Sequence, residues 1–346
     1  MPVKIINVYK SLTIFILLAS TIVSLQASQL KEEEHALIAA ARKGDTNSVE
    51  ELILNGVSVD VIDYDKTVLM HAIEGGQLEI VKLLVYAGAN INEVIELPTG
   101  KYKSCPVLSA LAYPEILEFL VISGADVNIK LGQKRTPLHF AAEYHKLESA
   151  DILIKYGADV NSIDLYGKTP FHLSINHKVT AFFLLANGAD FEIIDHDGWK
   201  PLHRAYQGCQ IDIIKELLAR GGATNEFPPD GRNALHNAVL KISYPGVFEY
   251  IKFLIEDQNM NINEYTQSGG IRCTPIMHAL QQQNNLEDDF EILNYLIKMG
   301  ANLNATMYSG NRVLPKTNSM HSILAWARSQ NVPRYVIEWM VQNGAQ

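Results

Sequence analysis

Histidine is the residue type in this chain that could most readily carry chemistry. The chain holds 11 histidines among 346 residues, and four of them recur 31 to 33 residues apart, namely His139, His172, His203 and His236. A zinc ion needs ligands about 2 Å away that converge on one point. A recurrence every 31 to 33 residues indicates repeated structural units. When such units are helical and stack, equivalent side chains stand about 10 Å apart, the distance between packed helices. We therefore interpret the four histidines as structural and predict no metal site.

Other motifs of catalysis are missing from the sequence. It contains no G-x-S-x-G nucleophile motif, no H-E-x-x-H or C-x-x-C pair, and no glycine-rich phosphate loop after a strand. The acidic run Glu287-Asp288-Asp289 lacks the alternating oxygen ligands of a calcium loop, so we interpret it as a solvated turn. We predict no catalytic residue and no cofactor.

The first of these four histidines, His139, lies in a unit at residues 136–161. This unit reads T-P-L-H-F-A-A-E-Y-H-K-L-E-S-A-D-I-L-I-K-Y-G-A-D-V-N. Thr136 can cap the N–H groups at a helix start, and Pro137 suits the first helical position. Residues 147–156 predict a second helix, and Gly157 suits the left-handed residue that ends it. We expect this second helix to turn three residues inward: Ile152, Leu153 and Ile154. One unit cannot bury its apolar face alone, so it needs copies on both sides.

The copies are present along the chain. The position of Thr136 recurs as Thr67, Cys105, Thr169, Lys200, Asn233, Thr274 and Ser322. This pattern resembles the ankyrin repeat family, whose signature is T-P-L-H-x-A at a period of about 33 residues. The resemblance implies an all-α solenoid of stacked helix pairs with β-turn finger loops. It covers residues 31–346 as about eight to nine repeats, the first and last degenerate, and it implies that the recurring histidine supports the turn by hydrogen bonding.

The repeats depart from a regular pattern at several places. Long insertions occupy residues 93–104, 264–273 and 305–321. In the third repeat the turn between the two helices is short by two residues, and Tyr113-Pro114 replaces the usual glycine turn. The fifth repeat also has a shortened turn, at residues 176–178.

Three cysteines, Cys105, Cys209 and Cys273, fall in three different repeats. A disulfide needs its Cα atoms within about 7 Å of each other, which is less than the distance between stacked repeats. We therefore expect no intramolecular disulfide, and we place Cys209 in an inter-helix turn where it could be exposed.

The N-terminus has the pattern of a secretory leader. Lys4 and Lys10 precede an apolar run, and no charged residue occurs between Lys10 and Lys31. A basic start, an apolar run and small residues predict a signal peptide at residues 1–27. The alternative is an uncleaved membrane anchor, because this uncharged stretch of 20 residues could just span a bilayer. Both interpretations export the repeats: periplasmic or secreted after cleavage, and membrane-anchored outside the cytoplasm otherwise.

The charge balance narrows the class of partner. Lys and Arg number 29 against 38 Asp and Glu, which gives a net charge of -9. A chain this acidic is a poor candidate for binding nucleic acid or anionic lipid. We expect a protein partner, no nucleic acid, and membrane contact only through an uncleaved N-terminal segment.

The resemblance implies that a partner binds the finger loops and the inner helix surface. The predicted partner-binding residues are Tyr64, Lys66, Arg135, Tyr144, Tyr166, Lys168, Asp197, Trp199 and Arg232. The position before the threonine is basic in four repeats and Trp199 in a fifth, so we expect a basic row with interleaved aromatic residues. Such a row suits an acidic protein segment, with Trp199 as its anchor. The alternative is that these are ordinary solvated finger residues.

Two classes of function are compatible with these observations. The first is an exported scaffold for protein–protein interaction without catalysis. The second is a membrane-tethered structural spacer or a stabiliser of an envelope complex. Whether residues 1–27 are absent from the mature protein distinguishes the two.

Overall fold

The computed structural model describes residues 29–96, 103–223, 226–242, 244–266, 271–281, 288–305, 308–309, 324, 327–328, 332 and 334–345. The predicted signal peptide or anchor, residues 1–27, lies outside the described residues, as does most of the insertion at 305–321. The chain separates into two compact units, Met1–Asp159 and Val160–Gln346, and each is described by itself.

The helix pair that starts at Thr136 shows how the sequence folds locally. Helix α7 (Pro137–Glu143) begins directly after Thr136, and α8 (Leu147–Lys155) follows a short turn. The backbone N–H of Thr136 donates to Nδ1 of His139 at 3.1 Å, so the His139 side chain caps the start of α7. Gly157 has a φ of +91°, the left-handed conformation that glycine adopts without strain. The predicted start, second helix and glycine end are confirmed.

The prediction for the buried face of α8 is wrong in part. Leu153 is buried, but Ile152 and Ile154 are half-buried, and Ser149 and Ala150 complete the buried face. Three consecutive residues cannot face the same way in a helix with 3.6 residues per turn. The spacing of three to four residues selects Ser149, Ala150 and Leu153 instead.

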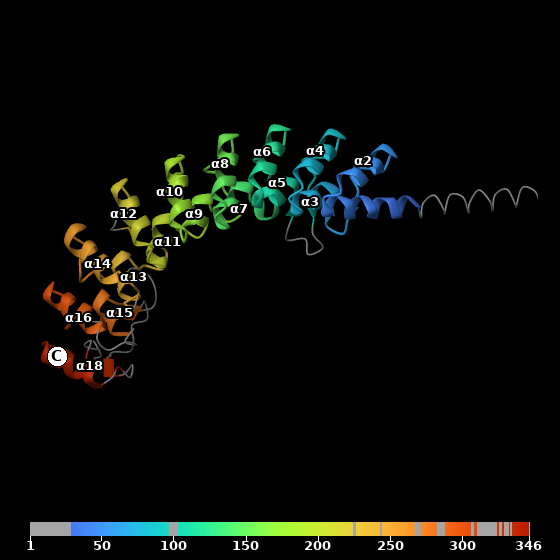
Figure 1. Cartoon of the computed structure of the whole chain (residues 1–346). Helices are drawn as coiled ribbons and strands as arrows, with labels where there is room; N and C mark the ends of the chain where they lie inside the picture. The colour runs from blue at the N-terminus through green and yellow to red at the C-terminus, as the bar shows by residue number, and fades with distance from the viewer. Residues whose placement is uncertain are drawn as a thin grey trace, which may run out of the picture. The chain divides into compact units, whose positions relative to one another are not determined.

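In the first unit the helices form two neighbouring rows (Figure 1). A helical segment at residues 29–43 precedes them. The first helices of the repeats are α3 (Val68–Glu74), α5 (Pro106–Ser109), continued by the 3₁₀ turn η1 (Ala110–Ala112), and α7. The second helices are α2 (Thr46–Leu54), α4 (Leu78–Tyr86), α6 (Pro114–Ile122) and α8. Within each row every helix packs against the next, so both rows are continuous stacks.

The second unit repeats this arrangement. Its first helices are α9 (Pro170–Ser174), α11 (Pro201–Gly208), α13 (Ala234–Val239) and α15 (Pro275–Gln281). Its second helices are α10 (Lys178–Ala186), α12 (Ile211–Ala219), α14 (Val247–Lys252), α16 (Asp288–Lys298) and α18 (Arg334–Gln342). Helix α14 continues as a π-helical segment, η3 (Phe253–Asp257). Asn259, which follows this segment, takes the left-handed conformation at φ +50°, as Gly157 does after α8.

The finger loops carry the short strands of the described residues. Strand β1 (Ile62–Asp63) pairs antiparallel with β2 (Lys66–Thr67), and β3 (Ile95–Glu96) pairs with β4 (Lys103–Ser104). Strand β5 (Ile271–Arg272) pairs with β6 (Tyr308–Ser309), which joins the fingers of two consecutive repeats. A further finger contains the 3₁₀ turn η2 (Gly132–Lys134). The predicted all-α solenoid of helix pairs with finger loops is confirmed.

Asparagines connect consecutive repeats through a ladder that the sequence analysis did not identify. The Asn92 amide donates to the Gly124 carbonyl at 3.2 Å and accepts the Asp126 N–H at 2.8 Å. The same donation to a helix-ending glycine is made by Asn128, Asn161, Asn263 and Asn304. The ladder satisfies carbonyl groups that the helix ends leave free. Its signal in the sequence is an asparagine four residues after the left-handed residue that follows a second helix, which is Gly88, Gly124, Gly157, Asn259 or Gly300.

The recurring histidines hydrogen-bond to the backbone, as the resemblance implied. Nδ1 of His172 accepts the Thr169 N–H at 3.2 Å, so its proton lies on Nε2, which donates to the Trp199 carbonyl at 3.2 Å. Nε2 of His236 likewise contacts the Cys273 carbonyl at 3.1 Å. Each of these histidines therefore links the first helix of its repeat to the finger of the next repeat. Burial lowers the pKa of His172, and burial together with His278 lowers the pKa of His236 to about 3.

The three cysteines are free thiols, as expected. Cys105 and Cys273 are buried, while Cys209 is half-buried in a left-handed turn with φ +52°. Among the described residues, no helix is both long enough and apolar enough to cross a membrane.

Candidate partner-binding surface

Two of the four basic finger residues are held by carboxylates of their own repeats. Nζ of Lys66 lies 2.8 Å from Glu74, and a guanidinium nitrogen of Arg135 lies 2.8 Å from Glu143. Both pairs are eight residues apart and occupy equivalent positions, one at the finger base and one at the end of the first helix. We call these two ion pairs the finger clasps. They neutralise much of the charge that the predicted basic row would offer to a partner.

The other two basic residues of the predicted row are half-buried. The Lys168 ammonium lies 5.9 Å from the centre of the Tyr166 ring. The backbone N–H of Arg232 donates to the Asp230 carboxylate at 3.0 Å, and the backbone carbonyl of Arg232 accepts from the side-chain amide of Asn237 at 3.2 Å. The two contacts of Arg232 fix the backbone of its finger.

Trp199 is not an exposed anchor, and this prediction is wrong. Only 9% of the residue is exposed, because the Arg204 guanidinium covers its ring at 4.5 Å from the centre. The backbone N–H of Trp199 donates at 2.9 Å to Asp195, whose side chain is 0% exposed and also pairs with Arg204 at 2.9 Å. Burial by itself would raise the pKa of Asp195, but the Trp199 N–H and the Arg204 charge hold it below its ordinary value. Trp199 therefore belongs to the structure of its finger.

The remaining predicted residues reach solvent. Tyr64 is 96% exposed at the tip of the β1–β2 finger, Tyr144 is 57% exposed at the end of α7, and Tyr166 is 45% exposed. The side chain of Asp197 is 72% exposed and lies 4.0 Å from Arg204. Of the nine predicted residues, Arg135 and Tyr144 lie together, because both line a hollow on the first-helix row of the first unit.

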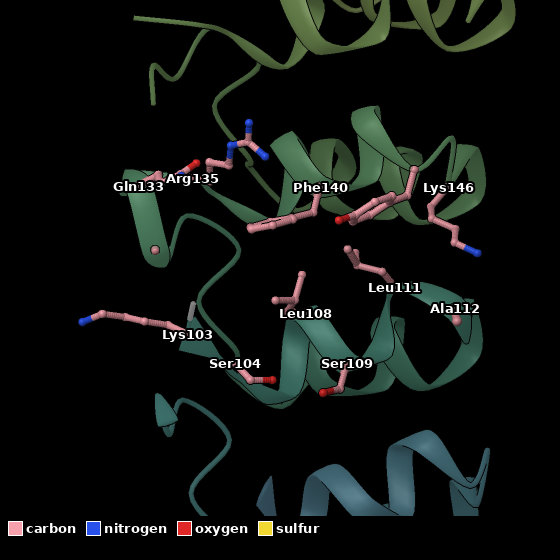
Figure 2. A pocket seen from close by; sticks show the side chains of 12 residues that line it. Lys103, Ser104, Leu108, Ser109, Leu111, Ala112, Gln133, Arg135, Phe140 and Lys146 are labelled. Atoms are coloured by element: carbon pink, nitrogen blue, oxygen red, sulfur yellow. The ribbon is translucent and has the colours of Figure 1, made fainter. Parts of the chain in front are cut away.

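The hollow lies between α5–η1 of the third repeat and α7 of the fourth (Figure 2). Its volume is about 430 Å³. Figure 2 shows Leu108 and Leu111 pointing across it toward Phe140, with Lys103 and Lys146 at opposite ends. The remaining lining residues are Ser104, Ser109, Ala112, Gly132, Gln133, Arg135 and Tyr144. The rings of Phe140 and Tyr144 stack with their centres 6.4 Å apart and their planes at 23°.

The shortened turn of the third repeat creates this hollow. Helix α5 and its 3₁₀ continuation together span residues 106–112, which are the same register positions as residues 137–143 of α7. The difference comes after these helices: Tyr113 alone leads into α6, whereas Tyr144, His145 and Lys146 lead from α7 into α8, so the third repeat has one turn residue where the fourth has three. The Leu111 carbonyl, in η1, accepts a hydrogen bond from the Ser149 hydroxyl of α8 at 2.8 Å.

The ends of the hollow are positive. Its lining contains Lys103, Arg135 and Lys146 and no carboxylate. Lys103 pairs with Glu96 across the β3–β4 hairpin, and this hydrogen bond lowers the pKa of Glu96. Arg135 is held by its clasp, while Lys146 is exposed and forms no ion pair within the described residues.

Sequence reasoning missed the apolar part of this site. Leu108, Leu111 and Phe140 occupy ordinary first-helix positions, so nothing in their residue types marked them. The available signal was the missing glycine turn at Tyr113-Pro114, which predicted an inter-helix turn shorter by two residues but not the space beside it. Among the described residues, no group of three or more His, Cys, Asp or Glu could hold a metal ion.

Sequence comparisons identify the family. Models of ankyrin repeats match residues 7–94, 108–195 and 176–266, and a model of a single ankyrin repeat matches residues 272–308. These matches cover most of the chain, so it belongs to the ankyrin repeat family. Ankyrin repeats imply protein–protein interaction, and the family is generally non-enzymatic.

Several curated proteins are similar over part of their length. Rabankyrin-5 of Mus musculus is 30% identical over 202 residues, which is 54% of this chain and 16% of that protein. An ankyrin repeat protein of fowlpox virus (strain NVSL) is 34% identical over 112 residues, 31% of this chain and 33% of that protein. Palmitoyltransferase AKR1 of Lachancea kluyveri is 27% identical over 257 residues, 71% of this chain and 29% of that protein. The chain thus spans no more than 33% of the length of any of these three relatives.

Proposed function

We propose that this chain is an exported scaffold that binds a partner protein through its finger loops and first-helix surface and carries out no catalysis. The observation that supports this most directly is the set of exposed tyrosines, Tyr64, Tyr144 and Tyr166, that rigid helix pairs present at fingers and helix ends. Tyrosine is enriched among the residues that contribute most binding energy at protein interfaces. Repeated units hold such side chains in fixed positions, so little conformational freedom is lost on binding.

Export is the part of this proposal that rests on the sequence of residues 1–27. The basic start and uncharged apolar run support a leader that is removed, which would place the repeats in the periplasm or outside the cell. A tethered spacer is the alternative if the same segment stays as an anchor. We do not assign palmitoyl transfer, because the match to that relative covers 29% of it and falls on a chain that ankyrin repeat models match over most of its length.

Two measurements test the proposal. The intact mass of the natively expressed protein is expected to lack residues 1–27, and a mass that includes them supports the tethered alternative. Affinity capture with the native chain is then compared with a variant carrying Tyr64→Ala, Tyr144→Ala and Tyr166→Ala. We expect the variant to fold normally and to lose a partner that the native chain retains. A native chain that captures no specific protein in its own compartment would contradict the scaffold function.

A further inference from the structure

We propose that the hollow between α5–η1 and α7 binds an extended acidic segment of a partner protein, with one apolar side chain of that segment inserted among Leu108, Leu111 and Phe140. This inference rests on the proposed function as an interaction scaffold. It names the place on the scaffold and the chemistry of the partner, and it replaces the predicted anchor at Trp199, which is buried.

The apolar part of the argument comes from the walls of the hollow. Leu108 and Phe140 are half-buried with one side open, and Leu111 at the base is 5% exposed. The volume of about 430 Å³ lies within the range of ligand pockets, so it accommodates one large side chain and a stretch of backbone. An apolar group that enters this space removes its own surface and that of the walls from water.

The charges at the two ends indicate what flanks the apolar side chain. Lys103 and Lys146 stand at opposite ends of the hollow, with Arg135 in the lining between the finger and α7 (Figure 2). Lys146 has no carboxylate partner within the described residues, although the whole chain carries a net charge of -9. A carboxylate of the partner can pair with Lys146. A second carboxylate on the other side of the apolar residue can compete with Glu96 for Lys103, because that ion pair is exposed to solvent.

This two-ended charge pattern favours a polypeptide over a small amphiphile. A fatty acid has one carboxylate at one end of an apolar chain, so it could use only one of the two ends. An extended segment places side chains on both sides of a central residue, and the Tyr144 hydroxyl beside the stacked rings can hydrogen-bond to its backbone. The proposed occupant is therefore a segment with acidic residues before and after a Leu, Ile or Phe.

The test begins with a library of random peptides displayed on phage and selected on the full chain. We expect the enriched peptides to share a large apolar residue with acidic residues on both sides. One enriched peptide, labelled with a fluorophore, is then titrated by anisotropy against native protein and variants. Enriched peptides without this pattern, or no enrichment at all, overturn the proposal.

The variants separate the hollow from the rest of the surface. Leu108→Glu places a carboxylate in the hollow and is expected to weaken binding at least about tenfold, as for a central interface residue. Ser109→Trp fills the hollow without removing a wall and serves if Leu108→Glu fails to fold. Lys146→Glu is expected to weaken binding about fivefold and to reduce its dependence on salt. The matched control, Lys43→Glu, makes the same charge change at an exposed lysine at the end of the helical segment at residues 29–43 and is expected to change binding less than about twofold.

Further outcomes distinguish this inference from the function on which it rests. Unchanged peptide affinity in Leu108→Glu and Ser109→Trp, or displacement of the peptide by laurate at equal concentration, overturns the hollow as a peptide site. If the native partner is retained by both hollow variants but lost by Tyr64→Ala with Tyr166→Ala, the hollow is wrong and the scaffold function stands. If no partner is captured by native protein, the proposed function itself fails.

Discussion

Repeats four and six use the same two register positions in opposite ways. The position before the helix cap is Arg135 in repeat four and Trp199 in repeat six, and the position five residues later is Phe140 and Arg204. Each repeat thus has a cation over an aromatic ring, at 5.9 Å from the ring centre in repeat four and 4.5 Å in repeat six. The exchange of residue types decides which ring the fold covers and which ring it leaves open.

The finger explains why the outcomes differ. In repeat six the buried Asp195 accepts the Trp199 N–H and pairs with Arg204, so the finger, the ring and the helix are fixed together. In repeat four the equivalent finger position is Leu131, which has no carboxylate to offer, and Arg135 turns to Glu143 instead. An aromatic residue at the finger base is therefore buried, whereas an aromatic residue on the first helix faces the neighbouring repeat and is available to a ligand.

The largest expected effect on stability comes from removing each of the two aromatic rings. Trp199→Ala is expected to lower the free energy of unfolding by about 3–5 kcal/mol, the usual effect of emptying a buried aromatic site. Phe140→Ala is expected to lower it by about 1 kcal/mol, because its ring is already half-exposed. Urea unfolding followed by circular dichroism measures both. Equal losses would show that the two rings have the same role, contrary to the structure.

A second pair of substitutions marks what the two repeats share. Leu138 and Leu202 hold the same position of the signature and are 0% and 1% exposed. Leu138→Ala and Leu202→Ala are each expected to lower the free energy of unfolding by about 2–5 kcal/mol. Urea unfolding measures both losses. If the two leucine variants differ in this loss by more than the two aromatic variants do, the repeats differ in their cores as well.

The third prediction concerns pH and the histidines. Since the folded-state pKa of His236 is lowered to about 3, the unfolded chain binds more protons than the folded chain below an ordinary histidine pKa of about 6.5. The stabilising effect is thus complete above about pH 6.5 and is lost as the pH falls toward 3. Between pH 7.5 and pH 5, this one group is expected to lower the free energy of unfolding by about 2 kcal/mol.

His172 and His203 shift in the same direction because they too are buried, so the measured decrease should exceed the share of His236. Urea unfolding at several pH values measures the slope, and His236→Gln provides the control. That variant is expected to be less stable at pH 7.5 but to lose less stability on acidification. An unchanged slope would assign the effect to other groups.

The sequence predicted the parts of the fold that depend on local chemistry. The helix start at Thr136-Pro137, the left-handed Gly157 and the structural role of His172 all follow from residue types at a fixed spacing. The hollow could not be predicted in this way, because it depends on the space that remains between two neighbouring repeats whose inter-helix turns differ in length. The site also depends on which side chains neutralise one another, as Lys66 and Glu74 do.

The residues behind the error at Trp199 were nevertheless visible in the sequence. Asp195 and Arg204 flank Trp199 at positions four residues before and five residues after it, and together they could be expected to cover the ring. The predicted basic row depends on one finger position in each repeat, taken by itself. Pairing each finger base with the residue eight positions later would have identified the clasps of Lys66 and Arg135 in advance.

The smallest expected effect is that of the finger clasps on stability. A double-mutant cycle with Arg135→Ala and Glu143→Ala, measured by urea unfolding, is expected to give a coupling of about 0–1 kcal/mol, since both side chains retain contact with water. The Lys66–Glu74 clasp is expected to be weaker still, because its side chains are 29% and 36% exposed against 17% and 33%. Both couplings should shrink when the ionic strength is raised from 0.05 M to 0.5 M. A coupling above about 2 kcal/mol that does not respond to salt would mean that the clasps hold as firmly as the pair of Arg204 with Asp195, whose side chain is 0% exposed. In that case repeats four and six would fix their fingers equally firmly, and the contrast between them would lie only in the ring that each leaves exposed.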